Sequence, residues 1–290
     1  MENSANFDKI PESLRMYFDP EIVDRFAKRE ENEKYRSVAR IVEEIILSYS
    51  YSNNLRVADL GAGAHTENFP NLFAKLLSEN GVYDWVDISP FMIDLAKNRY
   101  LKLHPEREKV LCFLEKDIRE YLRELAPETL DVVIMKYTFD YFSREELHEI
   151  FSLLAVKLKS EATFVATLFM VDSVLPGRTT NAQMVYKGKE IPFGESVPIA
   201  DGDQFTIRFF VDPNEPELGY IAETTKYFHS PHTICDIIKN AFFSQGRDCK
   251  ENDFFIGNWK EIPAIKNRMT HGENFNEILD QNVFVIRKNE

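Results

Sequence analysis

The sequence predicts an α/β protein with a doubly wound, seven-stranded, mostly parallel sheet. Three observations predict this fold. Apolar strand segments alternate with helical segments from about residue 50 to residue 170. A glycine-rich turn follows the first of these strands, and the next strand ends in an acid. After residue 170 the alternation is interrupted by antiparallel β signals, which predict a β insert after the fifth strand.

Residues 1–50 are expected to form an N-terminal helical cap. Asp19 and Pro20 are typical of an N-cap and a first helical position, and the helix, or a broken pair of helices, continues to about Leu47. Its second part places five apolar residues on one helical face: Val38, Ile41, Val42, Ile45 and Ile46. Because this segment precedes the first strand, it is expected to cover the ligand pocket at the end of that strand.

Residues 51–170 are expected to form the core, with five strand–helix units. The strands are expected at about 55–60, 82–87, 109–114, 130–142 (the fourth strand with its loop) and 163–169. Asn80-Gly81 ends the first helix of the core, and Ser89-Pro90 begins the second. Ser143 and Glu146 form a capping box for the helix after the fourth strand.

Residues 171–229 are expected to form the antiparallel insert, a candidate substrate lid. Strands are expected at Gln183–Phe193, around the turn Lys187-Gly188-Lys189, and at Gln204–Asp212 and Tyr220–His229. Alternation along one strand predicts a buried face formed by Phe205, Ile207, Phe209 and Val211. That face would pack on the cap, on the active site or on a second subunit.

Residues 230–290 are expected to complete the core sheet. Ser230-Pro231 begins a helix that runs to about Phe243. Two more strands are expected at 253–257 and 282–287, the sixth and seventh of the sheet.

Composition narrows the class of partner. The net charge of −13, from 48 acidic and 35 basic residues, disfavours nucleic acid and anionic membranes as partners. The three cysteines, Cys112, Cys235 and Cys249, are widely spaced and odd in number, so disulfides and a metal site are not expected. No apolar run approaches the ~20 residues of a membrane span, and the N-terminus lacks a signal-peptide pattern. A cytoplasmic protein is expected.

The glycine-rich turn after the first strand predicts a nucleoside-bearing ligand. Gly61 and Gly63 permit a tight turn, whose free amide groups would point at the ligand. The dinucleotide fingerprint requires glycine at position 66, where this chain has Thr66. The carboxylate of Asp59 would repel a pyrophosphate, whereas it would attract an ammonium group. These residues favour the amino-acid end of S-adenosylmethionine.

Four segments, in order, resemble the motifs of class I S-adenosylmethionine-dependent methyltransferases. VADLGAGAH (57–65) resembles the first motif, WVDISPFMIDLAKNR (85–99) the second, FLEKDI (113–118) the third and LDVVIMKYTFDYF (130–142) the fourth. The chain departs from the family at His65, where a third glycine is common. The resemblance covers roughly residues 50–170 and implies a Rossmann-like methyltransferase fold.

The resemblance also implies a set of cofactor contacts. Asp59 would bind the methionine ammonium, directly or through water, or orient the turn. Asp87 would accept hydrogen bonds from both ribose hydroxyls, and Asp117 would contact the adenine amino group. Strand-end or helix-capping roles are the structural alternatives, and for Asp117 the two readings are equally supported. The expected cofactor-binding residues are Asp59, Gly61, Ala62, Gly63, Asp87, Ile88, Asp117, Ile118, Lys136 and Tyr137.

Methyl transfer depends mainly on placing the acceptor in line with the sulfonium, so a base is needed only for an acceptor that arrives protonated. The expected catalytic residues are Tyr137, Asp140 and His229, with His65 and His232 as further candidates for a base. A structural hydrogen bond is the alternative for each histidine, and plain core packing is the alternative for the aromatic loop.

The sequence therefore predicts an S-adenosylmethionine-dependent methyltransferase that acts on an N or O nucleophile of a small molecule, with an amine or a hydroxylated metabolite preferred. The insert and the cap favour an enclosed site. The alternative is a non-catalytic S-adenosylmethionine-binding regulatory protein. Thr66 and Asp59 disfavour a nicotinamide oxidoreductase, and a homodimer is left open.

Overall fold

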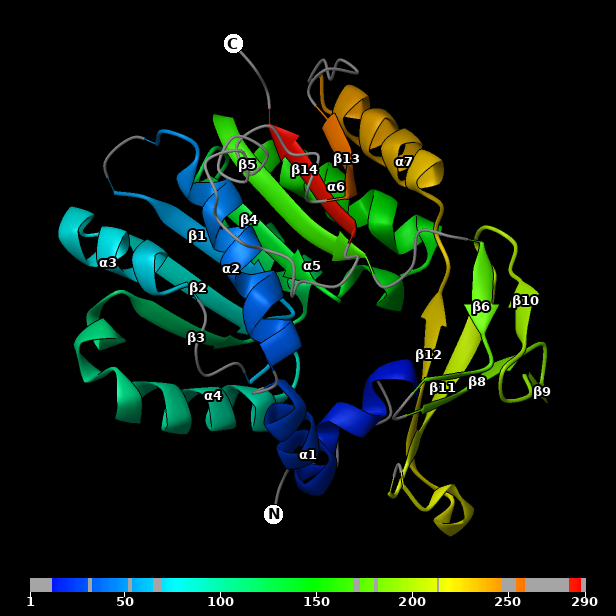
Figure 1. The fold of residues 1–290 in the computed structure, drawn as a ribbon. Coiled ribbons are helices and arrows are strands. Elements are labelled where there is room, and N and C mark those ends of the chain that lie inside the picture. The colour runs from blue at the N-terminus through cyan, green and yellow to red at the C-terminus, as the bar shows by residue number, and fades with distance from the viewer. Residues whose placement is uncertain are drawn as a thin grey trace, which may run out of the picture.

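The computed structural model describes residues 12–30, 33–51, 54–64, 69–168, 173–179, 182–212, 214–246, 254–258 and 282–287. A layered α/β core lies beside a smaller unit of β-strands, and the N-terminal segment 12–30 lies between the two (Figure 1).

The core is a sheet with the strand order β13-β14-β5-β4-β1-β2-β3. Five neighbouring strands are parallel, as predicted: β1 (Arg56–Leu60), β2 (Val82–Asp87), β3 (Leu111–Glu115), β4 (Leu130–Lys136) and β5 (Leu158–Leu168). Two C-terminal strands, β13 (Phe254–Asn258) and β14 (Asn282–Arg287), follow. β14 is antiparallel to both β5 and β13.

The fifth strand begins five residues earlier than predicted, at Leu158 rather than Thr163. The polar run Lys159-Ser160-Glu161 conceals this extension in the sequence. Leu158 pairs with Leu130, and the Nζ of Lys159 lies 2.8 Å from the carboxylate of Asp131 on β4.

Helices cover both faces of the sheet, so the sheet is doubly wound as predicted. One apolar cluster joins one face of the strands to α2 (Glu33–Leu47), α3 (Pro70–Glu79) and α4 (Pro90–Leu103). A second joins the other face to α5 (Ile118–Glu124), α6 (Arg144–Lys157) and α7 (Pro231–Ser244). Short 3₁₀ segments are η2 (Glu12–Phe18), η3 (Pro105–Lys109), η4 (Phe139–Tyr141) and η5 (Pro216–Leu218).

The helix caps expected from the sequence are present. Ser89 accepts a hydrogen bond from the amide of Met92 at the start of α4, and Ser230 accepts one from the amide of Thr233 at the start of α7. Ser143 and Glu146 form the predicted capping box of α6. Cys112 and Cys235 are free thiols, and Cys249 lies outside the described residues.

The segment that the sequence treats as one cap divides into two parts. The five apolar residues of α2 are buried in the core, so this helix supports the sheet. In contrast, α1 (Pro20–Glu30) packs against α4 through Val23 and Met92. The Nη1 of Arg25 donates to the carbonyl of Val211 at 3.1 Å, so α1 also reaches the insert.

The insert is antiparallel, as predicted. One sheet has the order β12-β11-β8-β7, with β9 paired to β8, and a second contains β10 and β6. The strands are β6 (Val174–Pro176), β7 (Arg178–Thr179), β8 (Ala182–Tyr186), β9 (Lys189–Glu190), β10 (Ser196–Pro198), β11 (Gln204–Phe210) and β12 (Tyr220–Tyr227). Lys187 and Gly188, both at positive φ, form the expected tight turn.

The predicted apolar face of the insert needs correction. Phe205 and Ile207 are buried, but Val211 is 37% exposed because β11 ends at Phe210. The buried residues pack with Leu175, Met184 and other residues of the insert itself. The insert therefore has its own small core, and this face is not reserved for the cap, the active site or a second subunit.

Candidate functional site

The glycine turn after β1 has the backbone that the sequence predicts. Gly61 and Gly63 have φ values of 69° and 65°, a region that favours glycine. A Cβ atom at Gly61 would lie 2.5 Å from both Cγ2 and Oγ1 of Thr138. Gly61 is therefore required both by its backbone angle and by the close approach of the loop after β4.

The amides of this turn are not free, contrary to expectation. The N–H groups of Gly61 and Ala62 donate to the carbonyl of Val86 at 2.9 and 3.0 Å, and the N–H of Gly63 donates to Asp87 Oδ2 at 2.9 Å. The turn lies against the end of β2, which satisfies its donors. Carboxylates are therefore better placed than amides to contact a ligand here.

Asp87 is buried at the end of β2 and already accepts backbone hydrogen bonds. Its Oδ1 accepts from the amide of Ser89 at 2.9 Å, and its Oδ2 accepts from Gly63. Burial raises the pKa of Asp87 to about 6, against the opposing effect of hydrogen bonds from the backbone of Ser89, Gly63 and Ile88. Each oxygen can accept a second hydrogen bond, so a vicinal diol fits this carboxylate.

Asp59, at the end of β1, is buried beside Lys136, at the end of β4. Asp59 Oδ2 accepts from the hydroxyl of Tyr83 at 2.8 Å and lies 3.3 Å from the Nζ of Lys136. That Nζ also lies 4.8 Å from the centroid of the Phe69 ring. Asp59 Oδ1 is buried without a hydrogen-bond partner among the described residues. An unpaired buried acceptor of this kind costs ~1–3 kcal/mol, which a donor on a ligand would recover.

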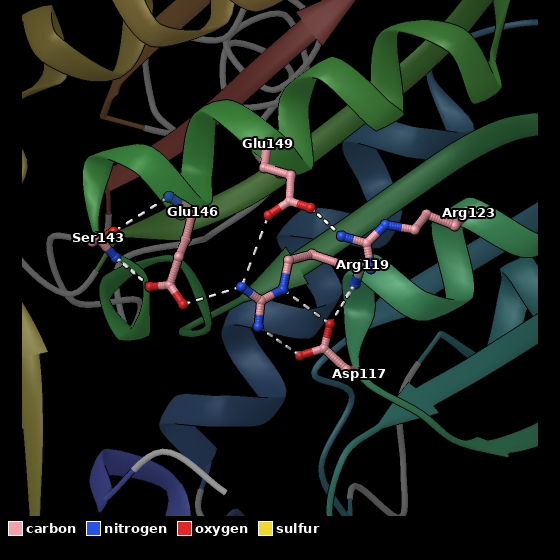
Figure 2. A network of polar contacts seen from close by, with 6 residues as sticks. All are labelled: Asp117, Arg119, Arg123, Ser143, Glu146 and Glu149. Atoms are coloured by element: carbon pink, nitrogen blue, oxygen red, sulfur yellow. Dashed lines mark hydrogen bonds and ion pairs between the residues drawn. The ribbon is translucent and has the colours of Figure 1, made fainter. Parts of the chain in front are cut away.

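Asp117 caps α5, and Arg119 beside it joins α5 to α6 (Figure 2). Its carboxylate accepts from the amide of Arg119 at 2.8 Å and is ion-paired with that guanidinium, which also contacts Glu146 and Glu149. Burial raises the pKa of Asp117, but the hydrogen bonds and charge of Arg119 outweigh it and lower the pKa overall. The capping role that the sequence left open is therefore present. Ile118, beside it, is buried.

The loop after β4 begins with a residue in an unusual conformation. Tyr137 has a φ of 54°, and its amide donates to Thr167 Oγ1 at 3.0 Å. A non-glycine residue at positive φ is uncommon, and such strain often accompanies a functional site. Next to it, Thr138 Oγ1 donates to the carbonyl of Lys136 at 2.9 Å. It also lies 3.4 Å from the carbonyl oxygen of Gly61, which places the loop against the glycine turn.

Asp140, in η4, meets Lys226, and Tyr141 beside it meets Tyr17; the sequence analysis missed both Lys226 and Tyr17. Asp140 Oδ2 is ion-paired with Lys226 of β12, and the Nζ of Lys226 lies 4.1 Å from the centroid of the Tyr141 ring. The hydroxyl of Tyr141 is hydrogen-bonded to that of Tyr17 in η2. One signal for Lys226 is available in the sequence. Lys226 lies two residues after Thr224, so the two share one face of β12, and both are buried.

The three candidate histidines have different positions. His229 is buried, its Nε2 lies 2.8 Å from the carbonyl oxygen of Phe142, and its Nδ1 has no partner among the described residues. Burial lowers the pKa of His229, opposed by the Phe142 hydrogen bond and by the charge of Asp201. His232 is exposed and pairs with Asp236. His65 lies outside the described residues.

The described residues include no cluster of His, Cys, Asp or Glu suited to a metal ion. Among the helices described, none has the length and apolar character needed to cross a membrane.

No protein-family model and no curated protein matches the chain. Solved structures do match it. The PH0226 protein of Pyrococcus horikoshii is 16% identical, with a TM-score of 0.54 over 97% of this chain and 100% of that one. S-adenosylmethionine-bound CalS10, an amino pentose methyltransferase of Micromonospora echinaspora, is 13% identical, with a TM-score of 0.50 over 92% of this chain and 97% of that one. The chain has the Rossmann-like fold of the S-adenosylmethionine-dependent methyltransferases.

Proposed function

We propose that the protein is an S-adenosylmethionine-dependent methyltransferase whose acceptor is an N or O nucleophile of a small molecule. The observation that carries this proposal is the pair of buried carboxylates at the ends of β1 and β2. Asp59 has an unpaired oxygen for an ammonium group, and Asp87 has the acceptor capacity for a ribose diol. The close approach of Thr138 to Gly61 adds a turn that only glycine fits.

The other proposed contacts follow the order of the strands. Ile88 continues from Asp87, and Asp117 with Ile118 follows β3, where adenine would lie. Ala62 lines the turn, and Lys136 and Tyr137 end β4. When bound, the cofactor supplies a methyl group on a sulfonium, which is a good leaving group. The protein has to hold the acceptor in line with it.

We also propose that β13 and β14 complete the seven-stranded sheet of this fold, that the insert covers the acceptor side and that the protein is cytoplasmic.

A non-catalytic S-adenosylmethionine-binding regulatory protein is the second candidate. Binding and transfer use the same residues at the ends of β1 and β2, so these residues do not separate the two functions. Transfer of label from methyl-labelled S-adenosylmethionine into a metabolite extract separates them. A regulatory protein would bind the cofactor and transfer no label.

Calorimetry tests the cofactor. We expect S-adenosylmethionine and S-adenosylhomocysteine to bind and NAD not to bind. Asp87→Ala should weaken S-adenosylmethionine binding by about tenfold or more, because a charged acceptor for two hydroxyls contributes roughly 1.5–3 kcal/mol. Asp94→Ala, on the exposed side of α4, is the matched control and should bind normally. Tight NAD binding without a response to S-adenosylmethionine would overturn the proposal.

A further inference from the structure

Three segments that are distant in sequence meet beside the proposed cofactor site. They are η2, the loop containing η4, and the end of β12 with the residues that follow it. Asp140, Tyr141 and Lys226 form a buried ion pair and a cation–π contact there, and η2 packs along β12. A core of apolar side chains would be the simpler way to join these segments, because burying charges requires compensation. The polar groups at this junction therefore call for a functional explanation.

Two atoms at the junction are acceptors without donors. Asp140 is 7% exposed and its Oδ1 has no partner among the described residues. His229 is 5% exposed. Its Nε2 faces the carbonyl oxygen of Phe142, which only accepts, so Nε2 carries the proton and Nδ1 is left as an unpaired acceptor. Both groups lie around Phe142, because Asp140 precedes it by two residues and His229 Nε2 contacts its carbonyl oxygen.

The junction is joined to the proposed cofactor site by two routes. Thr138, two residues before Asp140, contacts Gly61 of the turn. On the other side, the hydroxyl of Ser89 donates to the carbonyl of Tyr17, while the amide of Ser89 donates to Asp87. The unpaired acceptors therefore lie on the side of the cofactor where the loop after β4 and the insert meet.

We propose that this junction is the acceptor site, and that Asp140 Oδ1 and His229 Nδ1 bind a group that donates hydrogen bonds, either an amine or a hydroxyl, and not a carboxylate or phosphate. An anionic group would bring its own lone pairs against two acceptors, one of them charged. Lys226 does not reverse this preference, because its ammonium group is already held by Asp140 Oδ2 and the face of Tyr141. The insert contributes Lys226, which holds Asp140 Oδ2 and leaves Oδ1 for the acceptor. This inference rests on the proposed function.

Asp140 and His229 can take up the proton that methyl transfer releases. The lone pair of the acceptor nitrogen or oxygen forms a bond to the methyl carbon, and the carbon–sulfur bond breaks with its electrons remaining on sulfur. The acceptor thereby loses one proton, which His229 Nδ1 receives. Asp140 stabilises the imidazolium that results.

Two substitutions, one at each residue, remove the charged acceptor or the base with little change in shape. Asp140→Asn places an amide donor where Oδ1 accepts, because the amide oxygen remains directed at Lys226. His229→Gln keeps a donor for the carbonyl of Phe142 and removes Nδ1. Each should lower methyl transfer at least 30-fold, about 2 kcal/mol, and leave S-adenosylmethionine affinity within about twofold. Asp236→Asn on α7 and His148→Gln on α6, both at exposed positions, are matched controls and should retain full transfer.

Methyl transfer from S-adenosylmethionine that carries ¹³C in its methyl group identifies the chemical class of the acceptor. The wild-type protein is incubated with a metabolite extract, and the NMR shift of the transferred methyl separates N-methyl, O-methyl ether and methyl ester products. An N-methyl or ether product supports the inference and distinguishes amine from hydroxyl. A methyl ester, a methyl phosphate, or full transfer by Asp140→Asn would overturn it while leaving the proposed function intact. Absence of S-adenosylmethionine binding by the wild type would instead overturn the proposed function.

Discussion

Two buried Asp–Lys pairs flank the loop after β4, and they differ in the origin of their lysines. Asp59 and Lys136 both come from neighbouring strands of the core, β1 and β4. Asp140 follows β4, but its partner Lys226 belongs to the insert. In both pairs one carboxylate oxygen contacts the lysine, and Oδ1 has no partner among the described residues. The same arrangement is therefore built once within the sheet and once between the sheet and an added unit.

This difference suggests how the two halves of the proposed site are specialised. The sheet alone positions Asp59 and Lys136, so the cofactor half depends on the core. The acceptor half exists only when the insert lies against η4. Substitutions at the first pair should therefore change cofactor binding, and substitutions at the second should change the acceptor step.

The largest expected effect comes from removing the lysine of each pair. Lys136→Met leaves the carboxylate of Asp59 buried without a cation, which should cost ~3–5 kcal/mol of unfolding free energy. Lys226→Met should cost less, about 1–3 kcal/mol, because β12 can move away from η4 and admit water to Asp140. Urea unfolding measures both.

The affinity for S-adenosylmethionine should also differ between the two lysine variants. Lys226→Met should bind S-adenosylmethionine within about twofold of the wild type, whereas Lys136→Met should bind it much more weakly. The double variant Asp59→Asn/Lys136→Met should recover part of the lost stability, since no unpaired charge remains. Equal loss of cofactor binding in both lysine variants would show that core and insert act as one unit.

Two glycines, Gly61 in the core and Gly188 in the insert, allow the cost of an added side chain to be compared between the two regions. Gly61 and Gly188 both have positive φ, but an added Cβ meets Thr138 at Gly61 and nothing within 4 Å at Gly188. Gly188→Ala should therefore cost only the backbone strain of ~1–2 kcal/mol. Gly61→Ala should cost about 2–4 kcal/mol, since overpacking is added, and should abolish cofactor binding. Unfolding curves of the two variants would contradict this interpretation if their midpoints were equal.

The titration of Asp87 gives a test of the core half alone. Its folded pKa of about 6 lies above the ordinary aspartate pKa of 3.8, so its contribution to stability is full below about pH 4 and is lost as the pH rises through about 6. Asp87→Asn should therefore abolish this pH dependence. Its gain from losing the buried charge at neutral pH should be largely offset, because its amide nitrogen would face one of the two backbone donors, Gly63 or Ser89.

Cofactor binding should depend on the same group in the opposite sense. Ribose hydroxyls donate to the ionised carboxylate, so S-adenosylhomocysteine should bind about tenfold more weakly at pH 5 than at pH 7. Calorimetry in buffers of different ionisation enthalpy measures the released proton. The affinity of Asp87→Asn, which does not titrate there, should be lower at pH 7 and nearly flat with pH.

The two regions also differ in how far the sequence predicts them. The parallel strands, the glycine turn, Asp59 and Asp87 follow from short segments whose order is fixed by the alternating fold. The insert strands are predictable as hairpins, but their position against η4 is not, because no local pattern records a contact such as Asp140 with Lys226, 86 residues apart. The burial of α2 in the core and the use of the turn amides by Val86 likewise depend on packing between segments.

Asp117 gives the smallest and sharpest test, because its capping role and its proposed adenine contact are separable. Asp117→Ser keeps a side-chain acceptor for the amide of Arg119, so stability should change by no more than ~0.5 kcal/mol. Asp117→Ala removes the cap and should cost about 1 kcal/mol. If the carboxylate also contacts the adenine amino group, both variants should bind S-adenosylhomocysteine about fivefold more weakly. The wild type should then reject the inosine analogue, in which oxygen replaces that amino group, while Asp117→Ser should no longer distinguish the two ligands. Equal affinities of wild type and Asp117→Ser for both ligands would assign Asp117 to the cap alone, and the network that joins α5 to α6 would then be purely structural.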